Sequence, residues 1–258
     1  MRSRAQRRSI GQGVARVGDR VSHNSGKPPS SLPAGSGGDN RAVDAFLDKI
    51  ARTPAVAPAG SRGRMVFALD ATLSRQPTWD LALSLQSRMF ETAAASGGLD
   101  VQLVYFRGLG ECRASRFVTN GGGLAALMQK IDCRGGHTQI GKVLKHVLGE
   151  TQEKKVAALV YVGDAMEENA DALAVTAGEL GLRGLKAFMF HEGHDPVAGA
   201  AFREIARLTG GVYASFDASS PKRLADLLAA AAAYAAGGRV ALERQGGDAA
   251  RLLLSQMR

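Results

Sequence analysis

Short apolar runs alternate with amphipathic segments through the middle of the chain, and this alternation limits the folds that are open to it. Runs of strand length are found at residues 65–69, 101–106, 156–162, 185–190 and 212–215. Alternating strands and helices are typical of α/β proteins, in which helices cover both faces of a mostly parallel sheet. Residues 113–118 are predicted to pair back on 101–106 across a turn near 108–111. The sequence therefore predicts a doubly wound α/β fold with a mostly parallel six-stranded sheet and one antiparallel edge strand.

The segments between these runs have the periodicity of helices. After Pro77, Leu81, Leu85 and Met89 fall on one helical face, and Gly97 is expected to follow the end of that helix. Further helices are predicted at residues 124–131, 169–180, 197–208 and 221–234, and one more begins within 135–141 and runs through Leu148. These helices supply the two layers that a doubly wound sheet requires.

The two ends of the chain break the pattern. Residues 1–41 are predicted to be a disordered basic arm and linker, because Pro, Gly and Ser are frequent and the first forty residues hold seven Lys or Arg against two Asp. Residues 42–62 are predicted as a short helix and a connector, and residues 63–236 as the folded domain. Residues 237–258 are predicted as a C-terminal tail, with 249–257 a marginal helix or a frayed end.

Composition favours a cytoplasmic protein without a membrane span. No apolar run approaches the roughly 20 residues that a membrane helix needs. Two cysteines, Cys112 and Cys133, are too few for a disulfide framework and are expected to be buried free thiols. The net charge of +9 includes the basic arm, which predicts non-specific contact of the arm with nucleic acid or acidic surfaces. The Arg-rich, acid-poor arm also shares features with organelle transit peptides.

Oxygen-bearing side chains follow the ends of two predicted strands. One group comes directly after the first apolar run, a carboxylate follows the third run, and a hydroxyl lies in a glycine-flanked loop between them. In chain order these candidate ligands are Asp70, Thr72, Ser74, Thr138 and Asp164. Ligands of a doubly wound sheet bind where the carboxyl ends of its parallel strands meet. Because carboxylates and hydroxyls suit a hard cation such as Mg²⁺, a metal site is predicted at that edge.

The order and context of these residues resemble the metal-ion-dependent adhesion site of von Willebrand factor type A (VWA) domains. The matching motifs are Asp70-Ala71-Thr72-Leu73-Ser74, Gly136-His137-Thr138 and Gly163-Asp164. The resemblance covers residues 63–235 and implies a Rossmann-like VWA sheet. Thr72 stands where the family usually has serine, which preserves the hydroxyl group. Ala165 follows Asp164 where many members have glycine, so the local turn departs from the family pattern.

The resemblance also implies a function. Asp70, Thr72 and Ser74 would ligate Mg²⁺ or Mn²⁺, and Thr138 and Asp164 would act directly or through water. Hydroxyls and water carry no formal charge, so the bound ion would stay electrophilic toward an outside oxygen. The implied partner is a protein that offers Asp or Glu to the metal. The implied role is an interaction module without intrinsic catalysis. Bacterial VWA domains of this size are often intracellular and act beside chaperones or ATPases, so the resemblance also implies a cytoplasmic assembly role.

Two other functions fit parts of the same pattern. A haloacid-dehalogenase-like phosphotransferase would use Asp70 as the nucleophile, and Asp164 with Glu167 or Glu168 would hold magnesium. Against this reading, no second Asp follows at position 72 as a general acid, and no lysine is clearly placed to neutralise the phosphoryl group. The nearest lysines are at 154–155. A metal-independent scaffold would instead bind nucleic acid through the basic arm.

Three further motifs have structural interpretations. The segment 136–142 imitates the start of a phosphate-binding loop, but Val143 stands where that loop needs Ser or Thr. The segment His191-Glu192-Gly193-His194-Asp195 lacks the helical spacing that aligns metal-binding imidazoles, so it is predicted as an ordinary loop. Glu167 and Glu168 are predicted to be the solvated start of a helix.

Overall fold

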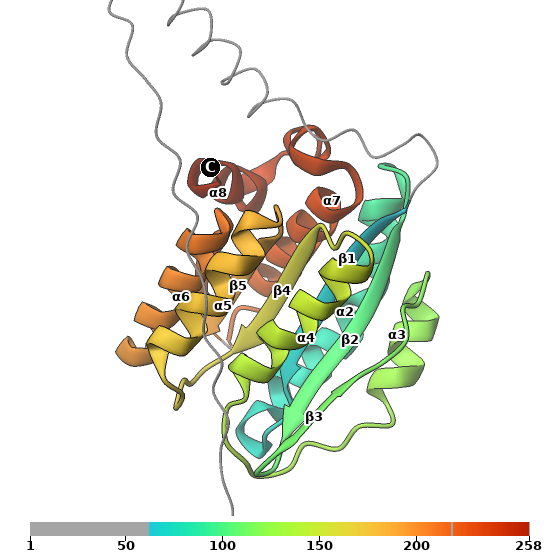
Figure 1. Ribbon diagram of the computed structural model, residues 1–258. Helices are drawn as coiled ribbons and strands as arrows, with labels where there is room; N and C mark the ends of the chain where they lie inside the picture. Colours follow the sequence, from blue (N-terminus) through green and yellow to red (C-terminus); the bar gives the residue numbers. More distant parts are fainter. Residues whose placement is uncertain (1–61, 218, 258) are drawn as a thin grey trace, which may run out of the picture. The chain divides into compact units, whose positions relative to one another are not determined.

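A single six-stranded sheet forms the centre of the folded domain (Figure 1). The computed structural model describes residues 62–217 and 219–257. The strands are β1 (Gly63–Asp70), β2 (Leu99–Arg107), β3 (Glu111–Ala114), β4 (Ala158–Gly163), β5 (Lys186–Glu192) and β6 (Val212–Phe216). They lie in the order β3-β2-β1-β4-β5-β6, and each neighbouring pair is parallel except β2 and β3. This confirms the predicted fold class and its antiparallel edge strand.

Helices cover both faces of the sheet. Their bounds are α2 (Gln76–Ala94), α3 (Gly121–Met128), α4 (Ile140–Glu153), α5 (Ala170–Leu182), α6 (Pro196–Thr209), α7 (Pro221–Gln245) and α8 (Gly247–Gln256). Helices α2, α3, α7 and α8 share one apolar core with one face of the sheet, and α4, α5 and α6 share the other core with the opposite face. The arm predicted at 1–41, and the helix and connector predicted at 42–62 except residue 62, lie outside the described residues.

Strand β1 is buried on both sides. Met65, Phe67 and Leu69 point into the core that includes α2 and α7, whereas Val66 and Ala68 point into the core that includes α4. This double burial explains why the strand has a continuous apolar sequence rather than an alternating one. Because β1 lies between β2 and β4, its carboxyl end lies in the middle of the row of strand ends.

The edge hairpin is shorter than the sequence predicts. Strand β3 ends at Ala114, and further along the chain the pairing consists of an isolated bridge between Val118 and Val101. The Arg107 guanidinium lies 2.9 Å from the Glu111 carboxylate across the turn, which stabilises an earlier start for the strand. Helix α3 also starts three residues before its predicted position, at Gly121. The side chain of Asn120 accepts a hydrogen bond from the Gly123 N–H at 2.8 Å and so caps the helix there.

The C-terminal segment is helical and contributes to the core, which differs from the predicted tail. Helix α7 continues past Gly237 and Gly238, where it kinks, and runs to residue 245. Leu242 of α7 and Leu253 of α8 are fully buried. The Gln256 side chain accepts a hydrogen bond from the Tyr213 N–H at 3.1 Å and donates one to the Tyr213 carbonyl at 3.0 Å. Helix α8 thus covers the outer edge of β6.

Among the described residues, one helix is long and apolar enough to cross a membrane by length and composition alone. This helix is α7, and 67% of its apolar window is buried inside the fold. It packs against α2 and β1, with its alanine-rich segment in the core. The burial is typical of a core helix.

Candidate metal centre

The loop after β1 places three of the candidate ligands side by side. Asp70 ends the strand and is only 4% exposed. Its Oδ1 accepts a hydrogen bond from the Thr72 N–H at 2.8 Å, and the hydroxyl oxygens of Thr72 and Ser74 are 3.3 Å apart. A short 3-10 turn, η1 (Leu73–Arg75), follows at once and reverses the chain. The spacing of two residues between these ligands therefore brings their oxygens to one rim.

The second loop, residues 133–139, lies against the first. The Arg134 N–H donates a hydrogen bond to the Ala71 carbonyl at 2.9 Å. Gly136 packs directly on the backbone of Gly108, because a Cβ at position 136 would lie 2.3 Å from both the nitrogen and the oxygen of Gly108. This close approach holds the loop inward, and Thr138 is 7% exposed.

The third loop begins with Gly163 and Asp164 at the end of β4. A Cβ at position 163 would lie 2.8 Å from the Tyr161 hydroxyl, so glycine is required for the tyrosine ring to lie beneath the loop. The Asp164 carboxylate is 3.2 Å from the Arg75 guanidinium, which reaches across from η1. The structure thus brings Asp164 toward the loop after β1, in agreement with the predicted neighbourhood of the two strands.

Glu167 joins the second and third loops through a reciprocal pair of hydrogen bonds. Its N–H donates to the Thr138 hydroxyl at 3.0 Å, and its carboxylate accepts the Thr138 N–H at 3.1 Å. The same carboxylate lies 3.0 Å from His137 Nδ1. Accepting the Thr138 N–H is the main cause that lowers the pKa of Glu167. Glu167 therefore orients the candidate ligand Thr138, a role that its sequence does not indicate.

Glu168 caps helix α4. Its carboxylate accepts hydrogen bonds from the Ile140 N–H and, at 2.9 Å, from the Gly141 N–H. A carboxylate is favourable there because the first N–H groups of a helix have no partner within the helix. Glu167 is exposed, as predicted for a solvated helix start, but Glu168 is half-buried. The rest of the prediction is wrong, since both carboxylates bind the neighbouring loop and α5 begins only at Ala170.

Replacing Glu168 with Ala is expected to lower the free energy of unfolding by about 1 to 2 kcal/mol, because two N–H groups of α4 would lose their acceptor. Chemical denaturation measures this loss. Glu179→Ala, on the exposed face of α5, is the matched control and should change the stability little. Equal stabilities of the two variants would contradict the capping role.

Burial sets the electrostatics of the site. It raises the pKa of Asp70 from 3.8 to about 6, the Thr72 hydrogen bonds oppose this shift, and the negative charge of Asp164 adds to it. Burial also raises the pKa of Tyr161 well above its usual value, with Asp70 as the next cause. The Asp70 carboxylate is thus a buried acid that positive charge would stabilise.

The donor set fits a hard divalent cation. It combines two carboxylates, Asp70 and Asp164, with the hydroxyls of Thr72, Ser74 and Thr138. The fully buried Tyr161 hydroxyl, beneath the third loop, has no hydrogen-bond partner among the described residues. Within residues 62–217 and 219–257, no three His, Cys, Asp or Glu side chains gather as a metal-binding group. An ion held here would therefore depend on hydroxyl oxygens, as Mg²⁺ sites often do on neutral oxygens.

The segment 191–195 has structural contacts of its own. His191 and Glu192 belong to β5 and are buried, so the prediction of a loop throughout this segment is wrong. His191 Nδ1 is 2.9 Å from the Tyr213 hydroxyl oxygen, and the Asp195 carboxylate accepts the Ala198 N–H at 2.6 Å to cap α6. These contacts stabilise the pairing of β5 with β6 and the start of α6.

The two cysteines and Lys142 have structural rather than metal-binding surroundings. Cys112 is half-buried and Cys133 is buried, and both are free thiols as predicted. Burial raises the pKa of both thiols. Lys142 donates from Nζ to the Gly110 carbonyl and to the Gln139 side chain, each at 2.8 Å. This ammonium group is thus used to tie α4 to the hairpin.

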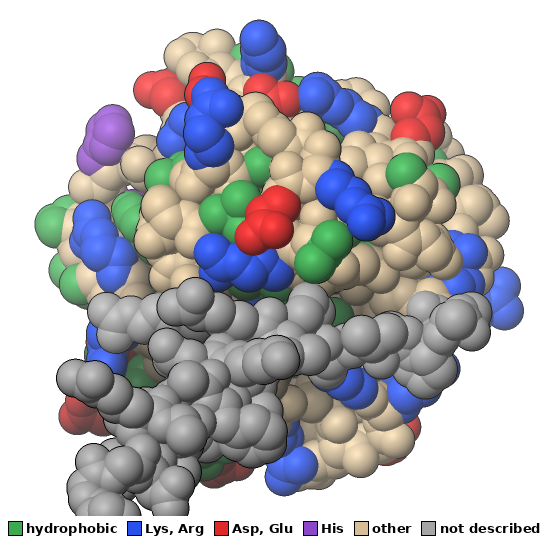
Figure 2. All heavy atoms as spheres, turned by 90° about the horizontal axis from the view of Figure 1, so that it is seen from above, with side chains coloured by type: hydrophobic (Ala, Val, Ile, Leu, Met, Phe, Trp, Pro, Cys, Tyr) green, Lys and Arg blue, Asp and Glu red, His purple; other side chains and the backbone are tan. Residues whose placement is uncertain are grey.

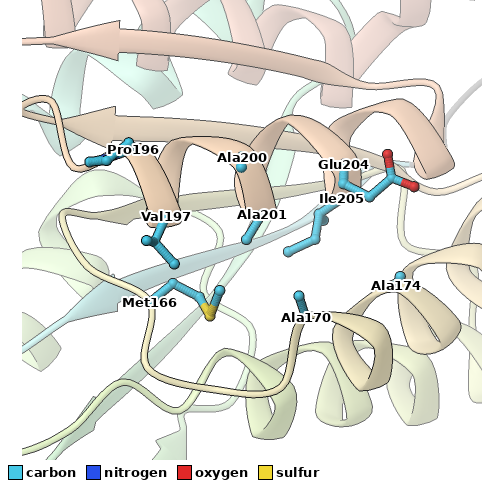
Figure 3. Close-up of a pocket in the computed structure, with 9 residues that line it drawn as sticks. All are labelled: Met166, Ala170, Ala174, Pro196, Val197, Ala200, Ala201, Glu204 and Ile205. Atoms are coloured by element: carbon cyan, nitrogen blue, oxygen red, sulfur yellow. The ribbon is translucent and has the colours of Figure 1, made fainter.

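Two hollows lie near the third loop. A polar one of about 350 Å³ is lined by Arg75, Asp164, Glu192, Gly193, His194, Asp195 and Asp217. An apolar groove between α5 and α6 is lined by Met166, Ala170, Ala174, Pro196, Val197, Ala200, Ala201, Glu204 and Ile205 (Figure 3). The groove offers one carboxylate among apolar side chains. The candidate ligands lie in the three loops, and the polar hollow gives access to Asp164.

No protein-family model and no curated protein matches the sequence. Solved structures do resemble the fold. The VWA domain of SpRpn10 has a TM-score of 0.51 and 11% identity, over 64% of this chain and 95% of that domain. Proximal thread matrix protein 1 from the mussel byssus has a TM-score of 0.52 and 15% identity, over 69% of this chain and 48% of that one. At these identities the likeness concerns the fold.

Proposed function

Since the chain adopts the von Willebrand factor type A fold, we propose that it is a protein-interaction module whose binding depends on Mg²⁺ or Mn²⁺. The proposed metal ligands are Asp70, Thr72, Ser74, Thr138 and Asp164. The observation that supports this proposal is the meeting of three loops, far apart in sequence, at the carboxyl ends of β1 and β4. Hydrogen bonds and an ion pair tie these loops together.

The charge of the donor set suits recognition of an acidic side chain. The two carboxylates would only balance the charge of a divalent ion, and the three hydroxyls are neutral. The ion would therefore still attract a further anionic oxygen. Ser74 and Leu73 are exposed at the rim, and the polar hollow opens beside Asp164. A partner's Asp or Glu could therefore approach from solvent.

The phosphotransferase alternative has less support. Lys154, one of the two lysines considered for the phosphoryl group, lies near the start of β1, because its carbonyl accepts a hydrogen bond from Arg64 at 2.6 Å. Asp70 is at the opposite end of that strand. Position 72 carries a hydroxyl, and the proposal therefore assigns no catalytic step to the site.

The face of the folded domain shown in Figure 2 gives little support for nucleic-acid binding. On the face shown in Figure 2, Lys and Arg side chains of the described residues are interspersed with acidic ones and do not form one basic patch. Nucleic-acid binding usually requires such a patch.

Mg²⁺ at about 100 times its dissociation constant is expected to raise the melting temperature of the wild type by about 5 °C or more. Asp70→Ala should abolish this response. Asp80→Ala is the matched control, because Asp80 is exposed on α2 and accepts a hydrogen bond from Gln76. A thermal melt with Mg²⁺ and with EDTA measures the effect. An equal Mg²⁺ response in Asp70→Ala and wild type would overturn the metal assignment.

Capture of partner proteins with and without EDTA tests the interaction itself. Binding that is lost in EDTA and in Asp70→Ala supports the proposal. If removal of residues 1–40 abolishes all binding while Asp70→Ala has no effect, the arm is the interaction element. Phosphatase turnover by the pure protein that is lost in Asp70→Asn would favour the enzyme instead.

A further inference from the structure

Arg75 places a permanent positive charge inside the candidate metal centre. It follows Ser74 directly, and its side chain is 12% exposed. One guanidinium nitrogen lies 3.2 Å from Asp164 Oδ2, and another lies 2.5 Å from Glu192 Oε2. The guanidinium therefore bridges a carboxylate at the end of β4 and one at the end of β5.

The two carboxylates differ in their surroundings. Glu192 is 7% exposed and also accepts a hydrogen bond from the Thr78 hydroxyl, so its position is fixed from α2 as well. The Asp164 side chain is 29% exposed and lies at the polar hollow. Of the two ion pairs, the one with Asp164 is longer and closer to solvent. It is the pair that can be exchanged with less disturbance of the fold.

The contact is electrostatic rather than a bidentate hydrogen-bonded pair. Arg75 Nε and Nη1 are buried, and neither forms an aligned hydrogen bond with any described residue, although Nη1 is close to Glu192. A guanidinium at its strongest donates two parallel hydrogen bonds to one carboxylate. Arg75 does not reach that geometry, so its hold on Asp164 depends on charge.

We propose that Arg75 is a tethered competitor of the metal ion, pairing with Asp164 when the site is empty and giving way when a divalent cation binds. This inference rests on the proposed function, because it assumes that the ion binds at these loops. Arg75 would then remain on Glu192, close to a second positive charge. Repulsion between the two cations, and the loss of the Asp164 pair, would weaken metal binding. Arg75 therefore sets the metal concentration at which the site fills.

The positive charge of Arg75 would act on the site whether or not a metal ion is bound. It also gives the empty site a means of limiting repulsion between Asp70 and Asp164, which act on each other electrostatically. The competitor would thus stabilise the empty form while lowering the affinity of the filled one.

Titration calorimetry of the full chain with Mg²⁺ alone tests the inference. Arg75→Gln removes the charge and is expected to bind Mg²⁺ about tenfold more tightly than wild type. Arg75→Lys keeps the charge and should stay within about twofold of wild type. Arg88→Gln is the matched control on α2, because Arg88 pairs with Asp226 at 2.8 Å on the surface, and it should bind as wild type does.

The outcomes separate this inference from the proposed function. If wild type binds Mg²⁺ and Arg75→Gln binds equally or more weakly, the competitor is ruled out while the metal site stands. If neither binds, both fall. If Arg75→Gln alone binds, the competition is stronger than expected. Should the loss of the charge beside buried Glu192 unfold the variant, Arg75→Gln combined with Glu192→Gln removes the unpaired carboxylate, and it should show the same tighter binding.

Discussion

Replacing Asp70 with Asn is expected to raise the free energy of unfolding of the metal-free protein by about 2 to 3 kcal/mol at about pH 8. Burial raises the pKa of Asp70 from 3.8 to about 6, so at pH 8 the empty site holds a charge that the fold disfavours. The oxygen of Asn can still accept the Thr72 N–H. The variant therefore loses the unfavourable charge and keeps the loop contact.

The raised pKa also fixes the direction of the pH dependence. Because Asp70 binds its proton more tightly in the folded state, the protonated form stabilises the metal-free protein fully below about pH 4. That stabilisation is lost as the pH rises through about 6, and Asp70→Asn should lack the loss. Urea denaturation in EDTA at about pH 5 and about pH 8 measures it.

Added Mg²⁺ should reverse the ranking, because the wild type gains stability and Asp70→Asn does not. Asp80→Asn, on the exposed side of α2, should follow the wild type in both conditions. The same dependence on pH in wild type and Asp70→Asn would contradict the burial argument. The expected reversal would make the site resemble many functional sites, which reduce stability in order to hold a ligand.

Gly136→Ala is expected to lower the free energy of unfolding by about 2 to 4 kcal/mol. The new Cβ would lie 2.3 Å from the backbone of Gly108, which cannot yield as a flexible side chain would. The loop would have to move outward, and Thr138, two residues on, would move with it. Mg²⁺ binding should therefore weaken together with stability.

The neighbouring glycine supplies the control for this prediction. A Cβ at position 135 would meet its nearest neighbour, Leu73 Cδ1, at 3.9 Å, which is ordinary contact. Gly135→Ala should accordingly differ from wild type by less than about 0.5 kcal/mol. Chemical denaturation and Mg²⁺ titration of both variants measure the contrast. Comparable losses in the two variants would show that the loop does not depend on the contact with Gly108.

The sheet and the places of the candidate ligands could be predicted because they follow from local patterns. A continuous apolar run such as 65–69 identifies a strand buried on both faces, and the residue after it must lie at the carboxyl end. Parallel strands then bring Asp70 and Asp164 to the same edge. Whether their oxygens ligate a metal stays a prediction.

The contacts that organise these ligands could not be predicted in the same way. Arg75 and Glu192 are more than a hundred residues apart, and Glu167 meets Thr138 across two separate loops. No periodicity connects such residues, because a side-chain pair of this kind depends on how each loop turns. A carboxylate at Glu167 or Glu168 has the same local sequence whether it faces solvent or a neighbouring helix.

The C-terminal segment was mispredicted for a related reason. Two consecutive glycines, Gly237 and Gly238, ordinarily end a helix, and the sequence alone favours that outcome. In the structure, Gly238 takes a positive φ of 68°, which bends the chain, and the helix resumes. Leu242 and Leu253 then complete the core.

The pairing of Gln256 with β6 gives the last helix a protective role. An unpaired outer strand offers free backbone groups on which another chain can build, and this is a common route to aggregation. The side-chain amide of Gln256 forms hydrogen bonds with both the N–H and the carbonyl of Tyr213. At this residue it therefore occupies the backbone groups that a further strand would pair with. A chain that ends before α8 would expose the outer edge of β6. Its first consequence would be self-association rather than loss of ion binding.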